Sequence, residues 1–175
     1  GYMFGDIGNN LTFATVSSFL MIFYTNVLGI SAAIVGVLFL TARVIDAFAD
    51  LTVGRLIDNS ALHDDGRFRP WIKRMKYPLF LFSILLFLPW IQGMSVGIKT
   101  VYIFFTYIVW GILYSTVNIP YGSMASAIST SPFDKTSLSN FRSIGAAIGG
   151  ILVSYLIPMF MYDKGSQQIS GMRLF

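Results

Sequence analysis

The stretch AAIVGVLFLTARVIDAFADLTVGRLI, residues 32–57, decides the fold of this chain. It is long and apolar enough to cross a membrane as one helix, which requires about 20 mainly apolar residues. Comparable runs cover residues 11–30, 78–96, 101–127 and 143–162, and segments rich in Gly, Ser, Asp and Pro separate them. The sequence therefore predicts an all-α integral membrane fold of five complete spans, joined by loops short enough for antiparallel neighbours.

The composition is typical of a membrane protein. Of the 175 residues, 55% are hydrophobic and 11% are charged, whereas about one-quarter of the residues of soluble domains are charged. The absence of cysteine and the single histidine exclude disulfides, thiol-ligated metals and multi-histidine metal sites. The net charge of +4 comes mostly from basic residues in short loops. This distribution indicates orientation in a lipid bilayer and not a nucleic-acid partner.

The basic residues also predict which way the helices cross the membrane. Cytoplasmic loops carry an excess of Lys and Arg, and counting alternate loops gives eight on one side and three on the other. The richer side has Arg55, Arg67, Arg69, Lys73, Arg74, Lys76, Lys135 and Arg142, and the poorer side has Lys99, Lys164 and Arg173. We therefore expect a multi-pass protein of the cell (inner) membrane with a cytoplasmic amino terminus.

The chain is expected to be part of a longer protein. Its first apolar run has neither a basic leader nor a small-residue cleavage site, so it is predicted to be a mature span and not a signal peptide. A sixth helix is predicted to begin at Met172. Five spans and a fragment would leave a helix-facing surface uncovered, so we expect further helices to cover it.

Three ionisable residues interrupt the run at residues 32–57. Arg43, Asp46 and Asp50 are spaced by three and four residues and continue to Gly54, so all lie along one stripe of a helix. Ionisable groups inside a membrane face a bundle interior or a watery cavity and mark an ion or substrate pathway. Two neighbouring carboxylates can bind a proton or a small cation. The alternative is that Arg43 neutralises Asp46 and the trio joins helices; Asp50 is left over and is the first candidate for a coupling group.

Polar side chains in two other runs are candidates for binding a sugar. In YSTVNIPYGS, residues 114–123, Tyr114 and Asn118 lie one helical turn apart, and such amides and hydroxyls hydrogen-bond sugar hydroxyls well. Interhelical hydrogen bonding is the alternative role. Arg142 precedes the last run and either faces a cavity or extends to the membrane surface. Gly145 and Gly149 form a GxxxG pattern that permits close helix packing.

Several motifs together resemble a family of carriers. The segment GRLIDN…DGRFRP, residues 54–70, resembles the cytoplasmic loop signature of the major facilitator superfamily between its second and third helices. With YMFGDIGNN, FYTNVLGIS, ARVIDAFAD and YSTVNIPYGS, the chain is similar to the glycoside-pentoside-hexuronide:cation symporters, which include melibiose, glucuronide and xyloside permeases. The resemblance implies the amino-terminal half of a twelve-helix carrier, with substrate at the midplane and alternating access by rocking of two six-helix halves.

The resemblance also implies roles for individual residues. Asp46 and Asp50 match the cation-site aspartates of the melibiose permease, and Arg43 matches the arginine beside them. Arg142 matches a sugar-site arginine. A tyrosine and a threonine near the sites align with Tyr114 and Ser115.

At other positions the chain departs from the melibiose permease. Asn10 replaces a sugar-binding aspartate, Asn9 a lysine beside it, and Gly122 a tryptophan. Asn118 replaces an aspartate that serves both sugar and cation. Because sodium prefers several anionic or carbonyl oxygens, the loss of this carboxylate favours a proton as the coupling ion. The pattern is closer to that of the glucuronide and xyloside carriers.

The sequence thus predicts a secondary transporter that imports a glucuronide or a pentoside such as a xyloside by symport with a proton, with sodium at Asp46 and Asp50 as the alternative. The expected substrate ligands are Asn10, Tyr114, Asn118 and Arg142, the cation-coupling residues are Asp46, Asp50 and Ser115, and the gating or structural charges are Arg43, Asp58, Arg67 and Arg69. No cofactor or metal is expected. An enzyme is not expected either, since no nucleophile–base pair is visible. A lysolipid:cation symporter and a sugar-independent proton or cation conduit are the alternative functions.

Overall fold

The computed structural model describes residues 2–60, 66, 68–128 and 131–161, and among these the regular elements are all helical. In chain order the elements are α1 (Tyr2–Ile22), the π-helical turn η1 (Phe23–Val27), α2 (Ala32–Asp58), α3 (Phe68–Leu86), the 3-10 turn η2 (Pro89–Ile91), α4 (Val96–Ile128) and α5 (Pro132–Met161). The predicted all-α fold is confirmed. The predicted start of a sixth helix at Met172 lies outside the described residues.

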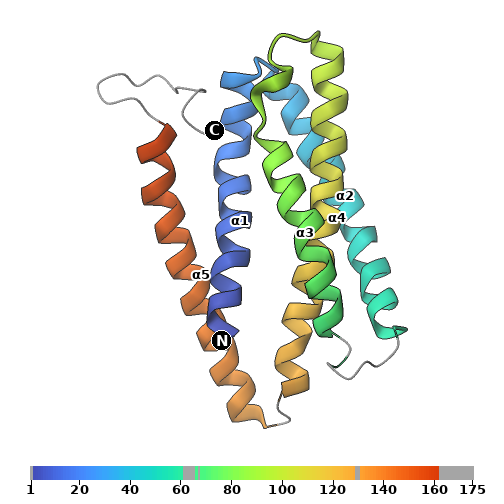
Figure 1. Cartoon of the computed structure of the whole chain (residues 1–175), viewed down its shortest axis with the longest axis vertical. Coiled ribbons are helices and arrows are strands. Elements are labelled where there is room, and N and C mark those ends of the chain that lie inside the picture. The colour runs from blue at the N-terminus through green and yellow to red at the C-terminus, as the bar shows by residue number, and fades with distance from the viewer. Residues whose placement is uncertain (1, 61–65, 67, 129–130, 162–175) are drawn as a thin grey trace.

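The five long helices run alternately up and down, side by side (Figure 1). Helix α4 packs against both α2 and α3, while α1 packs mainly against α5. By length and composition, three of the described helices can cross a membrane: Ala32–Asp58, Val96–Met124 and Pro132–Met159. In this arrangement the first residues of α1, α3 and α5 and the last residues of α2 and α4 share one end of the bundle.

Helix boundaries differ from the ends of the apolar runs. Helix α5 begins at Pro132, well before residue 143, because proline is favoured in the first turn and the polar residues after it continue a helix outside the apolar layer. Helix α3 begins at Phe68 and ends at Leu86, so the apolar run at residues 78–96 is divided between α3 and η2. Proline restricts the residue before it to extended conformations, and Leu88 before Pro89 is extended.

The main hydrophobic core joins α1, η1, α2, α3 and α4. Leu20, Phe23 and Tyr24 are fully buried there, together with Leu38 and Ile103. Two side chains secure the end of the π-helical turn: Gln92 Nε2 donates to the Val27 carbonyl at 3.0 Å, and Lys99 Nζ donates to the Leu28 carbonyl at 2.9 Å. The last carbonyls of a helix need such partners. The core therefore lies toward the end of the bundle opposite the amino terminus.

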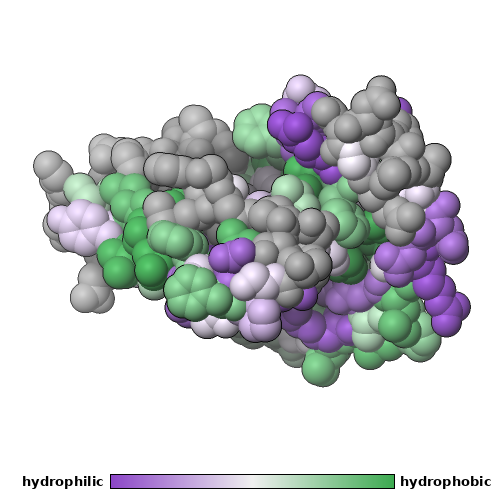
Figure 2. Space-filling model, turned by 90° about the horizontal axis from the view of Figure 1, so that it is seen from below, coloured by the Kyte–Doolittle hydropathy of each residue, from purple (hydrophilic) through white to green (hydrophobic). Residues whose placement is uncertain are grey.

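Large apolar side chains cover much of the outer surface. Leu40 is 72% exposed, Phe80 70%, Ile151 68% and Tyr155 70%. A soluble monomer rarely presents so much contiguous apolar surface. Viewed from the end that holds the amino terminus, hydrophilic residues gather toward the side of α2, and the coloured surface on the side of α5 is mainly hydrophobic (Figure 2). The chain is a membrane protein whose apolar faces meet lipid or further helices.

Helices α1 and α5 approach each other closely at Gly149. A Cβ added there would lie 3.3 Å from the Asn10 Cβ atom and 3.4 Å from the Ile7 carbonyl oxygen, whereas a Cβ added at Gly150 would meet nothing within 4 Å. The close packing predicted from the GxxxG pattern is therefore present at its second glycine.

We expect Gly149→Leu to destabilise the full-length protein in detergent by about 1–3 kcal/mol, because the larger side chain must push α1 and α5 apart. Gly150→Leu is the matched control and should leave the unfolding temperature near that of the parent. Thermal unfolding of both variants measures the difference. Equal unfolding temperatures for the two variants would contradict the packing.

Candidate functional site

The polar residues predicted from the sequence converge on α4 from three other helices. Helix α1 brings Asn9, α2 brings Asp46, and α5 brings Arg142, while Asn10 of α1 lies beside Gly149 of α5. Helix α4 itself carries Tyr107, Gly111, Tyr114, Ser115 and Asn118, which follow each other at helical spacing along its length. These positions form the candidate site, and its parts are described below in order along α4.

Two amides join α1 to α4. Asn9 Nδ2 donates a hydrogen bond of 2.9 Å to Asn118 Oδ1, and both residues are half-buried. Asn9 is not among the substrate ligands predicted from the sequence, whereas Asn118 is; by the resemblance, both stand where the melibiose permease has a charged residue. The structure shows that these two replacements are partners. An amide pair links the helices with a hydrogen bond and leaves no net charge at this position.

Arg142 reaches from α5 to α4. Its guanidinium carbon lies 5.8 Å from the centre of the Tyr121 ring, within cation–π distance. Its Nη1 atom lies 3.3 Å from the position that a Cβ on Gly122 would occupy. The Tyr121 ring in turn lies against Gly5 of α1, where an added Cβ would be 2.8 Å from Cε2. Arg142 is half-buried in this contact, so it does not extend freely to the membrane surface.

Tyr114 stands in a row of aromatic rings. Its ring centre is 5.3 Å from that of Phe13 on α1 and 5.4 Å from that of Trp110, with which it is stacked. The row continues to Tyr107, 5.9 Å from Trp110, and then to Phe39 on α2 at 5.2 Å. Trp110 is almost fully buried, and its indole N–H donates to Ser83 Oγ at 3.0 Å. The row fixes Tyr114 and connects the surroundings of Asn118 with those of Asp46.

Asp46 is the one acidic residue of the predicted stripe that faces α4. Its Oδ1 atom lies only 2.6 Å from the position of an added Cβ on Gly111. Arg43 and Asp50 are exposed in the described part of the chain, and no contact of ion-pair length joins Arg43 to Asp46 there. Ser115 is buried one helical turn after Gly111, on the same side of α4.

The predicted gating charges lie at the end of the bundle that holds the amino terminus. Asp58 is exposed in the last turn of α2, and Arg69 is exposed in the first turn of α3. Arg67 lies outside the described residues. The gating role of these residues stays a prediction, since no ion pair joins Asp58 to Arg69 among the described residues.

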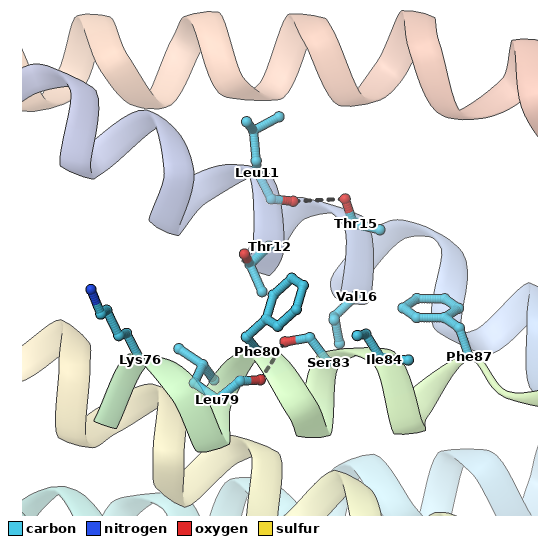
Figure 3. Close-up of a pocket in the computed structure, with 10 residues that line it drawn as sticks. All are labelled: Leu11, Thr12, Thr15, Val16, Lys76, Leu79, Phe80, Ser83, Ile84 and Phe87. Atoms are coloured by element: carbon cyan, nitrogen blue, oxygen red, sulfur yellow. Dashed lines mark hydrogen bonds between the residues drawn. The ribbon is translucent and has the colours of Figure 1, made fainter. Parts of the chain in front are cut away.

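A cavity of about 440 Å³ lies between α1 and α3 (Figure 3). Its wall is largely apolar, with Val16, Phe80 and Phe87 among the lining residues. The hydroxyls of Thr15 and Ser83 donate to carbonyls of their own helices, at 2.7 and 2.8 Å. None of the predicted substrate or cation residues lines this cavity. Its polar lining residues are few, Thr12, Thr15, Ser83 and Lys76.

We expect the Asn9–Asn118 hydrogen bond to contribute to the stability of the full-length protein. Removing each amide singly and then together, by Asn9→Ala and Asn118→Ala, should reveal a coupling energy of about 0.5–1.5 kcal/mol. Thermal or denaturant unfolding in detergent gives the four values. The matched control pairs Asn118→Ala with Asn140→Ala, an exposed position on α5, and should be additive. Additivity for both pairs would show that the two amides do not interact.

Comparison with known proteins agrees with this arrangement. A family model described as MFS/sugar transport protein matches residues 1–175. The chain is 42% identical over 170 residues to the glucuronide carrier protein homolog of Escherichia coli (strain K12), covering 97% of this chain and 36% of that protein. It is 39% identical to the isoprimeverose transporter of Lactiplantibacillus pentosus (97% and 35% covered) and 35% identical to the uncharacterized symporter YnaJ of Bacillus subtilis (strain 168) (99% and 38% covered).

The chain spans little more than a third of the length of these relatives. The helical fold, the membrane-length helices and the family match over the whole chain agree with one another. The resemblance found in the sequence is therefore confirmed: the chain belongs to the MFS/sugar transport protein family, among the glycoside-pentoside-hexuronide symporters, and corresponds to the amino-terminal part of such a transporter.

Proposed function

We propose that the full-length protein imports a glycoside, a glucuronide or a pentoside such as a xyloside, by symport with a proton. The observation that carries this proposal is the uncharged Asn9–Asn118 hydrogen bond, which lies on α4 close to Tyr121, the residue that Arg142 contacts. Two relatives are named as a glucuronide carrier homolog and an isoprimeverose transporter, which supports a glycoside as substrate. We infer from the excess of basic residues in alternate loops that the protein lies in the plasma membrane with its amino terminus in the cytoplasm.

The substrate ligands are Asn10, Tyr114, Asn118 and Arg142. Amide groups donate to and accept from sugar hydroxyls, and the face of an aromatic ring can pack on the apolar face of a sugar. A guanidinium binds a carboxylate through two parallel hydrogen bonds. With amides at positions 10 and 118, no carboxylate at these positions repels the acid group of a glucuronide. This combination favours a glucuronide, and a neutral xyloside uses the same amides without the ion pair.

The coupling ion binds at Asp46 and Asp50, and Ser115 lies on α4 one helical turn after Gly111, which Asp46 faces. A proton needs a single basic oxygen, while sodium needs several oxygen ligands in a fixed geometry. The amide at position 118 supplies no additional carboxylate. These residues therefore favour a proton, and sodium is the alternative outcome. Asp58, Arg67 and Arg69 form charge pairs on the cytoplasmic side that break as the two halves of the transporter rock.

In energy-depleted cells that express the full-length protein, addition of the transported glycoside without sodium should make the external medium more alkaline. Asp50→Asn should abolish this pH change, because the exposed carboxylate that takes up the proton is lost. Recording external pH while glucuronides and xylosides are added in turn identifies both ion and substrate class. Glycoside uptake that depends on sodium and causes no pH change would overturn proton coupling.

Two other outcomes would overturn the proposed substrate. Uptake of a fluorescent lysolipid without uptake of any glycoside would assign the protein to lipid transport on the same fold. Proton or cation flux that is unaffected by glycosides would indicate a conduit.

Substitution of Arg142 tests whether the substrate is anionic. We expect Arg142→Lys to reduce glucuronide uptake about tenfold, because an ammonium does not reproduce a bidentate charge-assisted bond of about 1.5–3 kcal/mol. Xyloside uptake by the same variant should fall much less. The ratio of the two uptake rates, at equal amounts of protein in the membrane, is the measurement. An equal loss for both sugars would assign Arg142 a role in packing against Tyr121 and not in recognising a carboxylate.

A further inference from the structure

The Trp110 side chain is held by two contacts of different kinds. Its indole N–H donates to Ser83 Oγ of α3 at 3.0 Å. Its ring is stacked on that of Tyr114, with the ring centres 5.4 Å apart and an angle of 24° between the planes. Only 3% of Trp110 is exposed, and a buried N–H that lost its acceptor would become a costly unsatisfied donor. The hydrogen bond therefore fixes the plane in which the Trp110 ring lies.

Ser83 is well suited to accept this hydrogen bond. A hydroxyl has one hydrogen to donate and two lone pairs that accept. Ser83 donates its hydrogen to the Leu79 carbonyl of its own helix at 2.8 Å, so the lone pairs of the same oxygen serve as the acceptor for the indole N–H. Two consecutive hydrogen bonds thus connect the backbone of α3 with the Trp110 ring on α4.

The orientation of Trp110 in turn limits that of Tyr114. Aromatic rings in contact favour offset-stacked or edge-to-face arrangements, so each ring restricts the rotation of the other. Trp110 stacks on Tyr114 from one turn earlier on α4, and Phe13 of α1 contacts the Tyr114 ring at 5.3 Å between centres. Tyr114 also lies one turn before Asn118. Rotation of the Tyr114 ring would therefore move its hydroxyl relative to the Asn118 amide, with which it is proposed to bind one glycoside.

Trp90 has the same two kinds of contact at the outer surface of the bundle. Its indole N–H donates to the Tyr102 hydroxyl at 3.4 Å, and its ring meets that of Tyr102 edge-on at 6.1 Å. Trp90 is 65% exposed, and neither Trp90 nor Tyr102 belongs to the proposed substrate or cation residues. Of these two tryptophans, Trp110 is the one whose contacts lead to a proposed substrate ligand.

We propose that Ser83 and Trp110 are positioning residues for the glycoside: the Ser83 hydroxyl fixes the Trp110 indole, and the Trp110 ring holds Tyr114 in the orientation that binds the sugar. Neither Ser83 nor Trp110 touches the substrate. This inference rests on the proposed function. It gives α3, which carries none of the proposed substrate ligands, a part in setting the affinity for the glycoside.

In the full-length protein, Ser83→Ala should raise KM for glycoside uptake about three- to tenfold, as expected for the loss of one hydrogen bond, and leave kcat near the parent value. Ser83→Thr keeps the hydroxyl and should retain the parent KM. Thr15→Ala is the matched control, because Thr15 lines the same cavity as Ser83 and its hydroxyl donates to a carbonyl of its own helix (Figure 3). An unchanged KM for Ser83→Ala, or an equal rise for Thr15→Ala or Ser83→Thr, would overturn the inference.

Trp110→Phe removes the indole N–H and keeps an aromatic ring, so it should raise KM as Ser83→Ala does. Because both variants remove the same hydrogen bond, combining them should add no further rise. Trp90→Phe is the matched control and should keep the parent KM. Additive effects of Ser83→Ala and Trp110→Phe, or an equal rise for Trp90→Phe, would overturn the inference.

A last comparison shows whether the effect passes through Tyr114. Purified Tyr114→Leu protein should still bind the glycoside, at lower affinity, through Asn10, Asn118 and Arg142. Adding Ser83→Ala to this variant should not weaken glycoside binding further. An equal additional loss in the parent and in Tyr114→Leu would show that Ser83 acts independently of Tyr114 and would overturn the inference. Absence of glycoside binding and uptake by the parent would instead refute the proposed function, and the inference with it.

Discussion

The polar centre of this bundle depends on glycines that allow a neighbouring helix to press a side chain against the backbone. Polar or charged groups inside a membrane are costly unless they face a partner or a cavity, and a missing Cβ lets such a group reach across to another helix. Each contact joins a different pair of elements: Tyr121 lies on Gly5, Asp46 on Gly111, Arg142 on Gly122, and Asn10 beside Gly149. The predicted substrate and ion residues are thus held by close helix packing as much as by hydrogen bonds.

Much of the fold follows from the sequence, because the apolar runs are long and well separated. Helix ends are less predictable, since helical hydrogen bonds are local and do not stop where the apolar layer stops. Helix α5 shows this: Pro132 starts it, and its polar first turns precede the run at residues 143–162. The opposite case is the apolar run at residues 78–96. Helix α3 ends inside this run, at Leu86, because Pro89 follows and the residue before it is extended.

The candidate site was predicted in part. The spacing of Arg43, Asp46 and Asp50 correctly predicts a shared helix, but which of the three faces another helix depends on where α4 lies. In the structure Asp46 lies against Gly111 of α4, whereas the side chains of Arg43 and Asp50 are exposed. Hydrogen bonds between residues distant in the sequence could not be predicted either. Asn9 and Asn118 are 109 positions apart, and their hydrogen bond is seen only when α1 and α4 are placed side by side. Glycines that make room for a side chain of a neighbouring helix follow no periodic pattern in the sequence. Spacing alone therefore could not identify Gly111 and Gly122 as parts of the site.

The hydrogen-bond ladder of helix α4 is interrupted between two of these contacts. Pro120 has no amide hydrogen, so the helical hydrogen bond to the Thr116 carbonyl is missing. The Asp46–Gly111 contact lies on one side of this point and the contact of Arg142 with Tyr121 lies on the other. A helix bends most easily where its hydrogen-bond ladder is interrupted. The Asn9–Asn118 bond, two residues before Pro120, ties α1 to this same segment. The part of α4 that is least constrained by its own backbone therefore lies between the Asp46–Gly111 contact and the Arg142–Tyr121 contact.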